Sequence, residues 1–388
     1  MRWDSLRLDS SGEADAGRPA LPLIERGAVA RTFDTPEFRG MTFYEIHAKS
    51  IVSEVPKTSR MAFRYTINPY RGCSHSCVYC FARQTHTYLD LDAGQDFNSR
   101  IVVKVNAPEL LRAKLASPGW AGEHIAMGTN VDCYQRAEGR YELMRGIIGA
   151  LRDAANPFSI LTKGTLILRD LDLLLAAAEV TDVGLNVSAA FVDKSLWRAI
   201  EPGTPAPERR LDVCATLTDA GLRCGVLMGP VVPYLSDSPA QLAAAVRGAA
   251  EAGAAHVTPI VLHLRPGARE WFLGWLREAH PDLVPRYAEL YGRGAYARKD
   301  YQRRIGAQVR ELADRFGVAW PGTGPAGAAG GPPPGRRTPS PRRALLGRGA
   351  RRRADGGPRP AATPGRPTRR GTSSSRSSSG PLPGPKHH

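Results

Sequence analysis

Three cysteines lie within eight residues of one another, at Cys73, Cys77 and Cys80. The spacing CxxxCxxC puts three thiols on one short loop, directly after the apolar run Tyr65–Ile67 and a glycine, Gly72. Three thiolates on a tight loop can bind three irons of a 4Fe-4S cubane and leave the fourth iron with an open coordination position. The spacing therefore predicts an iron-sulfur cluster that can accept a further ligand.

A zinc site is the main alternative use of these cysteines. Structural zinc takes four closed ligands, usually from two pairs of Cys or His. Cys77 and Cys80 form one such pair, but the chain has no second CxxC and no HxxxH, and His75 would reach the same ion only with strain. A disulfide framework is not expected either, because six cysteines in 388 residues are too few. The cluster is the favoured interpretation.

The net charge of +16 is concentrated at the C-terminal end of the chain. Residues 321–388 hold 14 Lys and Arg against the single acid Asp355, a charge of +13, which leaves +3 for residues 1–320. This segment has almost no large apolar residues, so it cannot bury enough surface to offset the entropy of ordering. The composition predicts a disordered tail. Its arginines are compatible with nucleic-acid binding, but compositional drift in Arg/Gly/Ala-rich proteomes is the favoured explanation.

Nothing in the sequence indicates export or a membrane span. The first residues lack the apolar run of a signal peptide, and no run of about 18 apolar residues occurs anywhere. We therefore expect a cytoplasmic protein without membrane contact.

From about Phe63, short apolar runs alternate with amphipathic stretches, a pattern typical of βα units around a parallel sheet. Six or seven units predict an α/β fold, a partial (β/α)6-type TIM barrel, whose chemistry collects at the carboxyl ends of the strands. The expected domains are an N-terminal extension over 1–60, the barrel over 61–320 and the tail over 321–388. Strands are expected at Tyr65–Ile67, Ile101–Lys104, Ile125–Gly128, Phe158–Thr162, Val183–Val187, Arg223–Met228 and His256–Leu262, and helices at Glu138–Asn156, Leu168–Ala178, Pro207–Ala220, Pro239–Ala252, Trp271–Ala279 and Arg304–Phe316.

The cysteine loop, with NPYRGC at its start and YCFAR at its end, resembles the radical S-adenosylmethionine (SAM) superfamily. The nearest branch is that of spore photoproduct lyase, with its uncharacterised actinobacterial members, and the resemblance extends from Thr42 to Phe316. It implies that Cys73, Cys77 and Cys80 bind a 4Fe-4S cluster and that SAM chelates the open iron. It also implies a one-electron reductant such as flavodoxin or ferredoxin, and cleavage of SAM to a 5′-deoxyadenosyl radical that abstracts hydrogen from the substrate.

The resemblance also implies SAM contacts near the ends of the strands. The Gly-Gly-Glu-Pro run of many family members is absent after Ile125–Gly128, so Thr129 and Asn130 or Asp132 would supply the polar contacts. These residues can also cap the helix that follows. The other implied cofactor-binding residues are Tyr79 near the adenine, Lys163 and Arg210 at the carboxylate, Ser188 at the ribose or carboxylate, and Pro233 in the loop around the adenine.

A catalytic thiol is less clearly indicated. Spore photoproduct lyase uses a thiol to return a hydrogen atom, and the aligned position here is Gly128. Cys133 is the thiol nearest the predicted site outside the cluster, so it is the candidate hydrogen donor. A lone cysteine is more often a small buried apolar residue. His256 and His263, at the two ends of the last strand, are further candidates for the substrate pocket.

The leading hypothesis is a radical SAM enzyme, with lesion reversal in DNA as the reaction that the resemblance suggests. Modification of RNA or of a protein side chain stays open, because a charge of +3 outside the tail gives little electrostatic support for DNA binding. Two alternatives of other classes are a zinc-stabilised nucleic-acid-binding protein that uses the basic tail, and an enzyme relic that keeps the cluster for structure or sensing.

Overall fold

The computed structural model describes residues 27–59 and 61–320. All described residues belong to one compact unit. The predicted tail over 321–388 lies outside the described residues. No helix among the described residues combines the length and the apolar character needed to cross a membrane.

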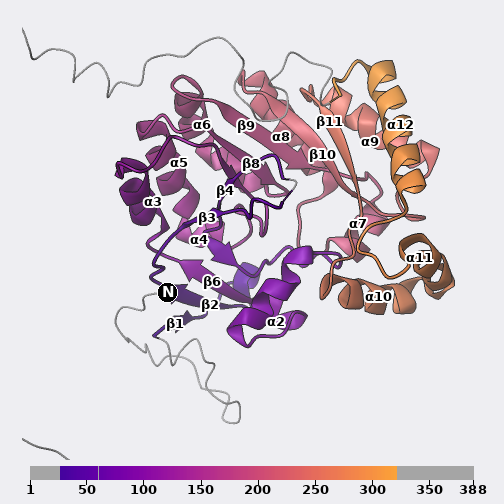
Figure 1. The fold of residues 1–388 in the computed structure, drawn as a ribbon, viewed down its shortest axis with the longest axis horizontal. Coiled ribbons are helices and arrows are strands. Elements are labelled where there is room, and N and C mark those ends of the chain that lie inside the picture. Colours follow the sequence, from indigo (N-terminus) through magenta and orange to yellow (C-terminus); the bar gives the residue numbers. More distant parts are fainter. Residues whose placement is uncertain (1–26, 60, 321–388) are drawn as a thin grey trace, which may run out of the picture. The chain divides into compact units, whose positions relative to one another are not determined.

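A seven-stranded sheet in the order β11-β10-β9-β8-β7-β4-β3 forms the centre of the fold (Figure 1). Six neighbouring strands run parallel, and β3 adds an antiparallel edge beside β4. Because β3 and β11 are the two ends of this order, the sheet does not close into a full barrel. The predicted partial (β/α)6 fold is confirmed. The strands are β3 (Val52–Glu54), β4 (Tyr65–Ile67), β7 (Ile125–Met127), β8 (Phe158–Thr162), β9 (Val183–Ser188), β10 (Cys224–Val231) and β11 (Val257–Val261).

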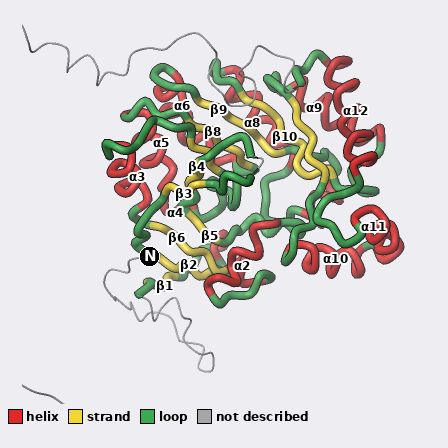
Figure 2. Tube along the Cα trace, in the orientation of Figure 1, coloured by secondary structure: helices red, strands yellow, loops and turns green. Residues whose placement is uncertain are grey.

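Alternate residues of these strands build the core on the helix side of the sheet. Ile125, Ile160 and Leu185 are at most 2% exposed, as expected for strands whose successive side chains point to opposite faces. Amphipathic helices cover that side (Figure 2). They are α3 (Ala107–Ala116), α5 (Leu143–Asp153), α6 (Leu171–Ala178), α8 (Pro207–Asp219), α9 (Pro239–Glu251) and α12 (Lys299–Phe316).

One predicted barrel strand belongs to a different sheet. The segment predicted as Ile101–Lys104 forms β6 (Arg100–Lys104), which lies in a four-stranded sheet of order β1-β2-β6-β5. Its apolar residues are buried on both faces, Ile101 and Val103 in the main core and Val102 in a small second cluster. A strand buried on both faces has the continuous apolar run that is also typical of a barrel strand. The other strands are β1 (Val29–Arg31), β2 (Thr42–Ile46) and β5 (Tyr70–Arg71).

The helices differ from the prediction mainly at their starts. The helix expected over Glu138–Asn156 is broken at Glu142, whose φ of 49° ends α4 (Glu138–Tyr141) before α5 begins. The Glu138 carboxylate accepts a hydrogen bond from the Met144 N–H at 3.0 Å and so caps α5. The remaining helices are the 3₁₀ turns η1 (Pro36–Phe38), η2 (Phe81–Leu89), η3 (Thr165–Asp170) and η4 (Pro281–Leu283), with α2 (Gln95–Ser99), α7 (Lys194–Ile200), α10 (Ala268–Ala279) and α11 (Val284–Tyr291).

Candidate active site

The three cysteines of the CxxxCxxC motif lie on the loop between β5 and η2. Gly72 starts this loop with a φ of +83°, and a Cβ there would lie 2.8 Å from a ring carbon of His86 and 2.9 Å from the Arg100 carbonyl oxygen. Only glycine fits this position without strain. Cys73 and Cys77 are 6% and 8% exposed, and Cys80 is half-buried. Burial raises the pKa of the Cys77 thiol to about 12, so the thiolate needs a positive partner at neutral pH.

Two fully buried polar side chains hold the backbone of this loop. The Gln135 amide oxygen accepts from the Ser74 N–H at 2.9 Å, and its NH₂ group donates to the Gly72 carbonyl at 2.9 Å. The Arg83 guanidinium donates to the Cys77 carbonyl at 3.0 Å and lies 4.5 Å from the Trp271 ring. Neither role was predicted, because the partners of Gln135 and the Trp271 ring beside Arg83 lie on distant segments of the chain.

Three predicted cofactor-binding residues come together at the carboxyl ends of neighbouring strands. The Lys163 ammonium after β8 donates to the Ser188 hydroxyl of β9 at 2.5 Å and to the Gly229 carbonyl of β10 at 3.3 Å. Asp132 accepts from the Lys163 N–H at 2.7 Å and from the Thr162 hydroxyl at 2.7 Å. The Asp132 carboxylate also lies 3.4 Å from His75 Nδ1, so it links these strand ends to the cysteine loop.

Tyr79 and Arg210, two further predicted residues, meet at a buried carboxylate, Glu201. The Tyr79 hydroxyl donates to Glu201, and the Arg210 guanidinium lies 2.5 Å from the other carboxylate oxygen. Glu201 and Arg210 are each 1% exposed. Burial acts to raise the pKa of Glu201, but the charges of Arg210 and Lys163 outweigh it and hold that pKa below its usual value. Arg210 thus acts here through Glu201, and its direct contact with a cofactor carboxylate stays a prediction.

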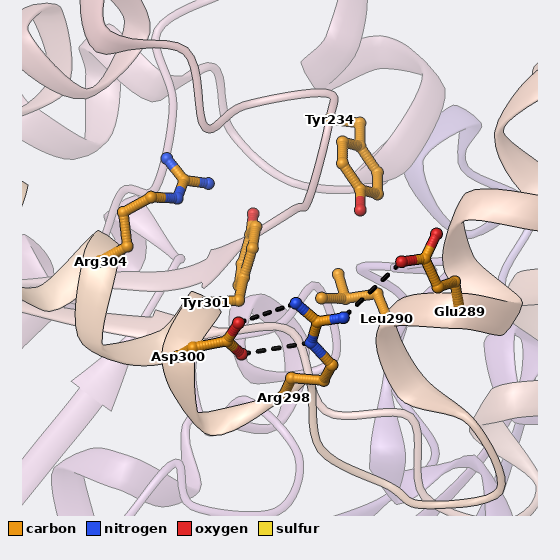
Figure 3. Close-up of a pocket in the computed structure, with 7 residues that line it drawn as sticks. All are labelled: Tyr234, Glu289, Leu290, Arg298, Asp300, Tyr301 and Arg304. Atoms are coloured by element: carbon orange, nitrogen blue, oxygen red, sulfur yellow. Dashed lines mark hydrogen bonds and ion pairs between the residues drawn. The ribbon is translucent and has the colours of Figure 1, made fainter.

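The other predicted cofactor-binding residues, Thr129, Asn130 and Pro233, lie outside these two groups of contacts. Thr129 and Asn130 are half-buried and directly follow β7 and Gly128. Pro233 is buried, and its carbonyl accepts from the Tyr287 hydroxyl at 2.8 Å. Beyond Pro233 the chain leads to a separate pocket of about 320 Å³ that contains none of the predicted cofactor residues (Figure 3). That pocket is lined by Tyr234, Glu289, Leu290, Arg298, Asp300, Tyr301 and Arg304.

The candidate hydrogen donor, Cys133, packs in the main core with 1% exposure. Burial raises the pKa of this thiol well above its usual value, so it stays protonated at neutral pH. At the alternative position, Gly128 has a φ of +74°, and a Cβ there would overlap the Leu161 carbonyl oxygen. A thiol at residue 128 is therefore excluded by the backbone of β8, and the donor role of Cys133 stays a prediction.

Replacing Gly128 by alanine is expected to destabilise the fold strongly. Positive φ alone costs a residue with a side chain about 1–2 kcal/mol, and the overlap with the Leu161 carbonyl adds about 1–3 kcal/mol. Urea denaturation of Gly128→Ala measures the sum. Gly122 is the matched control, because it has a φ of +73° but nothing within 4 Å of the added Cβ. Equal losses in Gly122→Ala and Gly128→Ala would show that the close approach to β8 is relaxed in solution.

His86 behind Gly72 makes the fold sensitive to acid. Its ring nitrogen lies 2.9 Å from the Arg100 carbonyl, and burial lowers the pKa of His86 from 6.5 to about 4. The unfolded chain therefore binds more protons between these values, so stability falls as the pH is lowered through this window, by about 2–3 kcal/mol. Denaturation midpoints from pH 7 to pH 4 measure this. The slope should shrink in His86→Phe without vanishing, because burial also lowers the pKa of His75 and His256. An unchanged slope would contradict the assignment.

Comparisons with known proteins identify the family. The family model described as the Radical SAM superfamily matches residues 67–245. The chain is 47% identical over 320 residues to a Mycobacterium tuberculosis protein named Uncharacterized protein Rv2578c, which covers 82% of this chain and 94% of that protein. The chain belongs to the radical SAM superfamily. A more distant relative, Uncharacterized protein MJ0683 of Methanocaldococcus jannaschii, is 33% identical over 174 residues, 45% of this chain and 62% of that protein.

Solved structures share the fold. Spore photoproduct lyase complexed with dinucleoside spore photoproduct superposes with a TM-score of 0.55 at 14% identity and covers 72% of this chain and 80% of that chain. A mutant of that enzyme with bound AdoMet and dinucleoside spore photoproduct has a TM-score of 0.54 at 16% identity and covers 69% and 79%. At these identities the likeness shows the open radical SAM barrel fold alone. The chain is a radical SAM enzyme by family.

The residues of the cysteine loop fit the cluster that this family implies. The three free thiols lie near one another on this loop, since the Cys77 and Cys80 thiols both act on the pKa of Cys73. Among residues 27–59 and 61–320, no three Cys, His, Asp or Glu side chains lie close enough to share one metal ion. A cubane does not need that convergence, because each cysteine binds its own iron. His75, the fourth ligand that zinc would need, instead faces Asp132.

Proposed function

We propose that Cys73, Cys77 and Cys80 hold a 4Fe-4S cluster and that Asp132, Lys163 and Ser188 orient SAM beside it. Bound together, these two groups supply a 5′-deoxyadenosyl radical, the species that abstracts hydrogen from a substrate. Thr129, Asn130 and Pro233 extend the proposed SAM site along the ends of β7 and β10. A reductant of the flavodoxin or ferredoxin class would deliver the electron.

The position of Lys163 is the observation that carries this proposal. Its ammonium lies 6.0 Å from the ring centre of Tyr79, the residue before Cys80. Its charge acts to lower the pKa of both Cys77 and Cys80, against the larger effect of burial. A cation that faces both the thiols and the Ser188 hydroxyl is placed to bind a carboxylate next to the cluster. With a side-chain exposure of 14%, Lys163 is partly shielded from water, which strengthens such a contact.

In this proposal Tyr79, Glu201 and Arg210 hold Lys163 and Ser188 in position. The Glu201 carboxylate lies 3.7 Å from the Lys163 ammonium and accepts a hydrogen bond from the Tyr79 hydroxyl. One buried carboxylate therefore orients both side chains. Arg210 neutralises Glu201 and donates to the Ser188 carbonyl at 3.1 Å, which ties the same charge to the end of β9. These contacts hold Lys163 and Ser188 in place before any ligand arrives.

Nucleic acid is the substrate class that we favour, with lesion repair as the reaction. The support is the fold shared with spore photoproduct lyase, whose structure holds a dinucleoside photoproduct. Lesion reversal requires a group that returns hydrogen, and Cys133 is the proposed donor because residue 128 has no room for a thiol. RNA or protein modification uses the same radical and differs only in the substrate.

The experiment is anaerobic reconstitution of the full chain with iron and sulfide. The proposal predicts brown protein whose absorbance bleaches with dithionite, and 5′-deoxyadenosine in the reaction mixture after SAM is added. Anaerobically purified protein that holds zinc and no iron would contradict the cluster. Colour without the nucleoside would leave the cluster assignment in place and contradict the proposed chemistry.

A further inference from the structure

Two basic side chains project from the same face of the four-stranded sheet, beside the start of the cysteine loop. Arg71 of β5 pairs with Val102 of β6, and Lys104 lies two residues beyond Val102 on the same strand. Because alternate residues of a strand share a face, Arg71, Val102 and Lys104 point to the same side, at a diagonal separation that long side chains span. The Lys104 ammonium donates to the Asn68 carbonyl at 2.8 Å, at the end of β4 in the barrel sheet. The pair therefore sits where the two sheets meet.

These two cations lack a counter-ion among the described residues. Neither forms an ion pair, the Arg71 guanidinium has no hydrogen-bond acceptor, and the one acceptor of Lys104 is a neutral carbonyl. The neighbouring Arg100, by contrast, pairs with Asp96 at 2.7 Å. The arginines of the pocket in Figure 3 are also neutralised, Arg298 by Asp300 at 2.7 Å and Arg304 by Asp237 at 3.4 Å.

The surroundings make the missing counter-ion costly. A small apolar cluster that includes Tyr44, Leu89 and Val102 covers this face of the sheet. Burial, together with the charge of Arg71, lowers the pKa of Lys104 to about 8, so the amine still carries most of its charge at pH 7. Two half-buried like charges without an anion are unfavourable, and a bound anion would relieve this.

The cysteine loop does not supply that anion. Neither Arg71 nor Lys104 donates a hydrogen bond to a cysteine sulfur within the described residues. Two of the thiols have other cationic neighbours, since Lys163 acts on Cys77 and Cys80 and Arg83 acts on Cys80. Among the described residues, Arg71 and Lys104 form no hydrogen bond or ion pair with the residues proposed to hold the cluster and SAM.

Two neighbours indicate what kind of anion would bind. Tyr88 is 72% exposed and its charge acts on the pKa of Arg71, so an aromatic surface that could stack with a base or sugar lies in the neighbourhood of these charges. The side-chain oxygen of Asn68, whose backbone carbonyl accepts from Lys104, is buried without a hydrogen-bond partner in the described part of the chain. A guanidinium and an ammonium are together suited to the oxygens of a phosphate group.

We propose that Arg71 and Lys104 form a binding site for a phosphate group of a nucleotide or nucleic acid, with Tyr88 beside it. The phosphate would anchor the substrate at the lip of the barrel, two residues before the first cysteine. That role rests on the proposed function, whereas the phosphate site itself rests on the charges alone. A failure of the site therefore leaves the cluster untouched, and cluster content measured on the same sample separates the two.

The test uses reconstituted full-length protein and the reactivity of Lys104 toward acetic anhydride, followed by mass spectrometry. Inorganic phosphate, a mononucleotide and a short single-stranded oligonucleotide are added separately. Protection should reach about tenfold at ligand concentrations near ten times Kd, because it follows 1 + [L]/Kd. Lys194, with a side chain 61% exposed and paired with Glu208, serves as the internal control whose reactivity should not change with inorganic phosphate or the mononucleotide.

The variants Arg71→Gln and Lys104→Met complete the test. Arg71→Gln should raise the Kd for phosphate, measured from the protection of Lys104, at least about tenfold. That is the value of one charge-assisted hydrogen bond. Lys104→Met should melt no lower than the parent chain without phosphate and lose the phosphate-induced rise in Tm. Arg64→Gln, whose exposed parent residue pairs with Glu54 at 2.8 Å, should behave like the parent.

Three results would overturn the site. They are the absence of Lys104 protection by all three ligands, unchanged protection in Arg71→Gln, and lower Tm in Lys104→Met with an undiminished response to phosphate. Protection by the oligonucleotide alone supports the site and identifies a nucleic-acid backbone as the source of the phosphate. Protection by all three supports it with a free nucleotide as the source.

Discussion

Replacing Cys77 by alanine is expected to remove the iron-sulfur chromophore and to lower 5′-deoxyadenosine formation more than about a hundredfold. Partners that only orient metal ligands are worth about 10–100-fold, so the loss of a ligand itself should exceed that range. The measurement is the absorbance of anaerobically reconstituted protein together with the nucleoside formed from SAM and dithionite. Cys77 is 8% exposed on the loop that Arg83 and Gln135 hold, so a change of this one thiol need not disturb the rest of the fold.

Cys214→Ala is the matched control for the cluster. Cys214 is also a buried free thiol, but it lies in the core on α8, with its sulfur 3.9 Å from the Cys224 carbonyl. Its replacement should lower stability by about 1 kcal/mol and leave both colour and nucleoside formation unchanged. Equal loss of 5′-deoxyadenosine in the two variants would refute the assignment of the ligands.

Replacing Arg210 by methionine is expected to destabilise the fold strongly. The change leaves Glu201, which is 1% exposed, without its main counter-charge. Removing one partner of a buried pair costs about 3–5 kcal/mol, because the remaining charge stays desolvated. Lys163 at 3.7 Å from Glu201 compensates in part, which favours the lower end of that range. Urea denaturation of the purified variant gives the value.

The double variant Glu201→Gln, Arg210→Met distinguishes charge from packing. If desolvated charge dominates, the double variant should regain at least about half of the loss of Arg210→Met, since no unpaired carboxylate remains. Lys194→Met is the control, because its ion pair with Glu208 at 3.1 Å joins the same two helices at the surface and is worth at most about 1 kcal/mol. No recovery in the double variant would mean that the contacts of Arg210 with Thr204 and Ser188 matter more than its charge.

The sequence predicted the three cysteines of the loop but not the two side chains that hold its backbone, Gln135 and Arg83. Cys73, Cys77 and Cys80 could be assigned together because a cubane is bound by residues a few positions apart, so their spacing alone carries the chemistry. Gln135 could not, because its amide binds backbone groups of Ser74 and Gly72, 61 and 63 residues away in the chain. Arg83 belongs to the YCFAR run, but that run does not indicate that its guanidinium binds the Cys77 and Gly94 carbonyls.

The strand-end residues were partly predictable. Asp132, Lys163 and Ser188 follow apolar runs, and the rule that parallel strands end at one edge already placed them near one another. The hydrogen bonds and ion pairs of these residues could not be predicted from the sequence. Glu201 becomes the centre of the site only because α7 and α8 bring it beneath Lys163 and Tyr79, and short helices such as α7 carry little periodicity of their own.

The sequence by itself determined the βα alternation, the open parallel sheet and the thiol loop, because each depends on residues close together in the chain. Only the tertiary structure decided that β6 joins the four-stranded sheet, since its apolar pattern fits either sheet. It also decided which charges are neutralised. Arg210 meets Glu201, whereas Arg71 and Lys104 meet no carboxylate among the described residues. Pairing of charges depends on distances across the fold, and no local pattern encodes them.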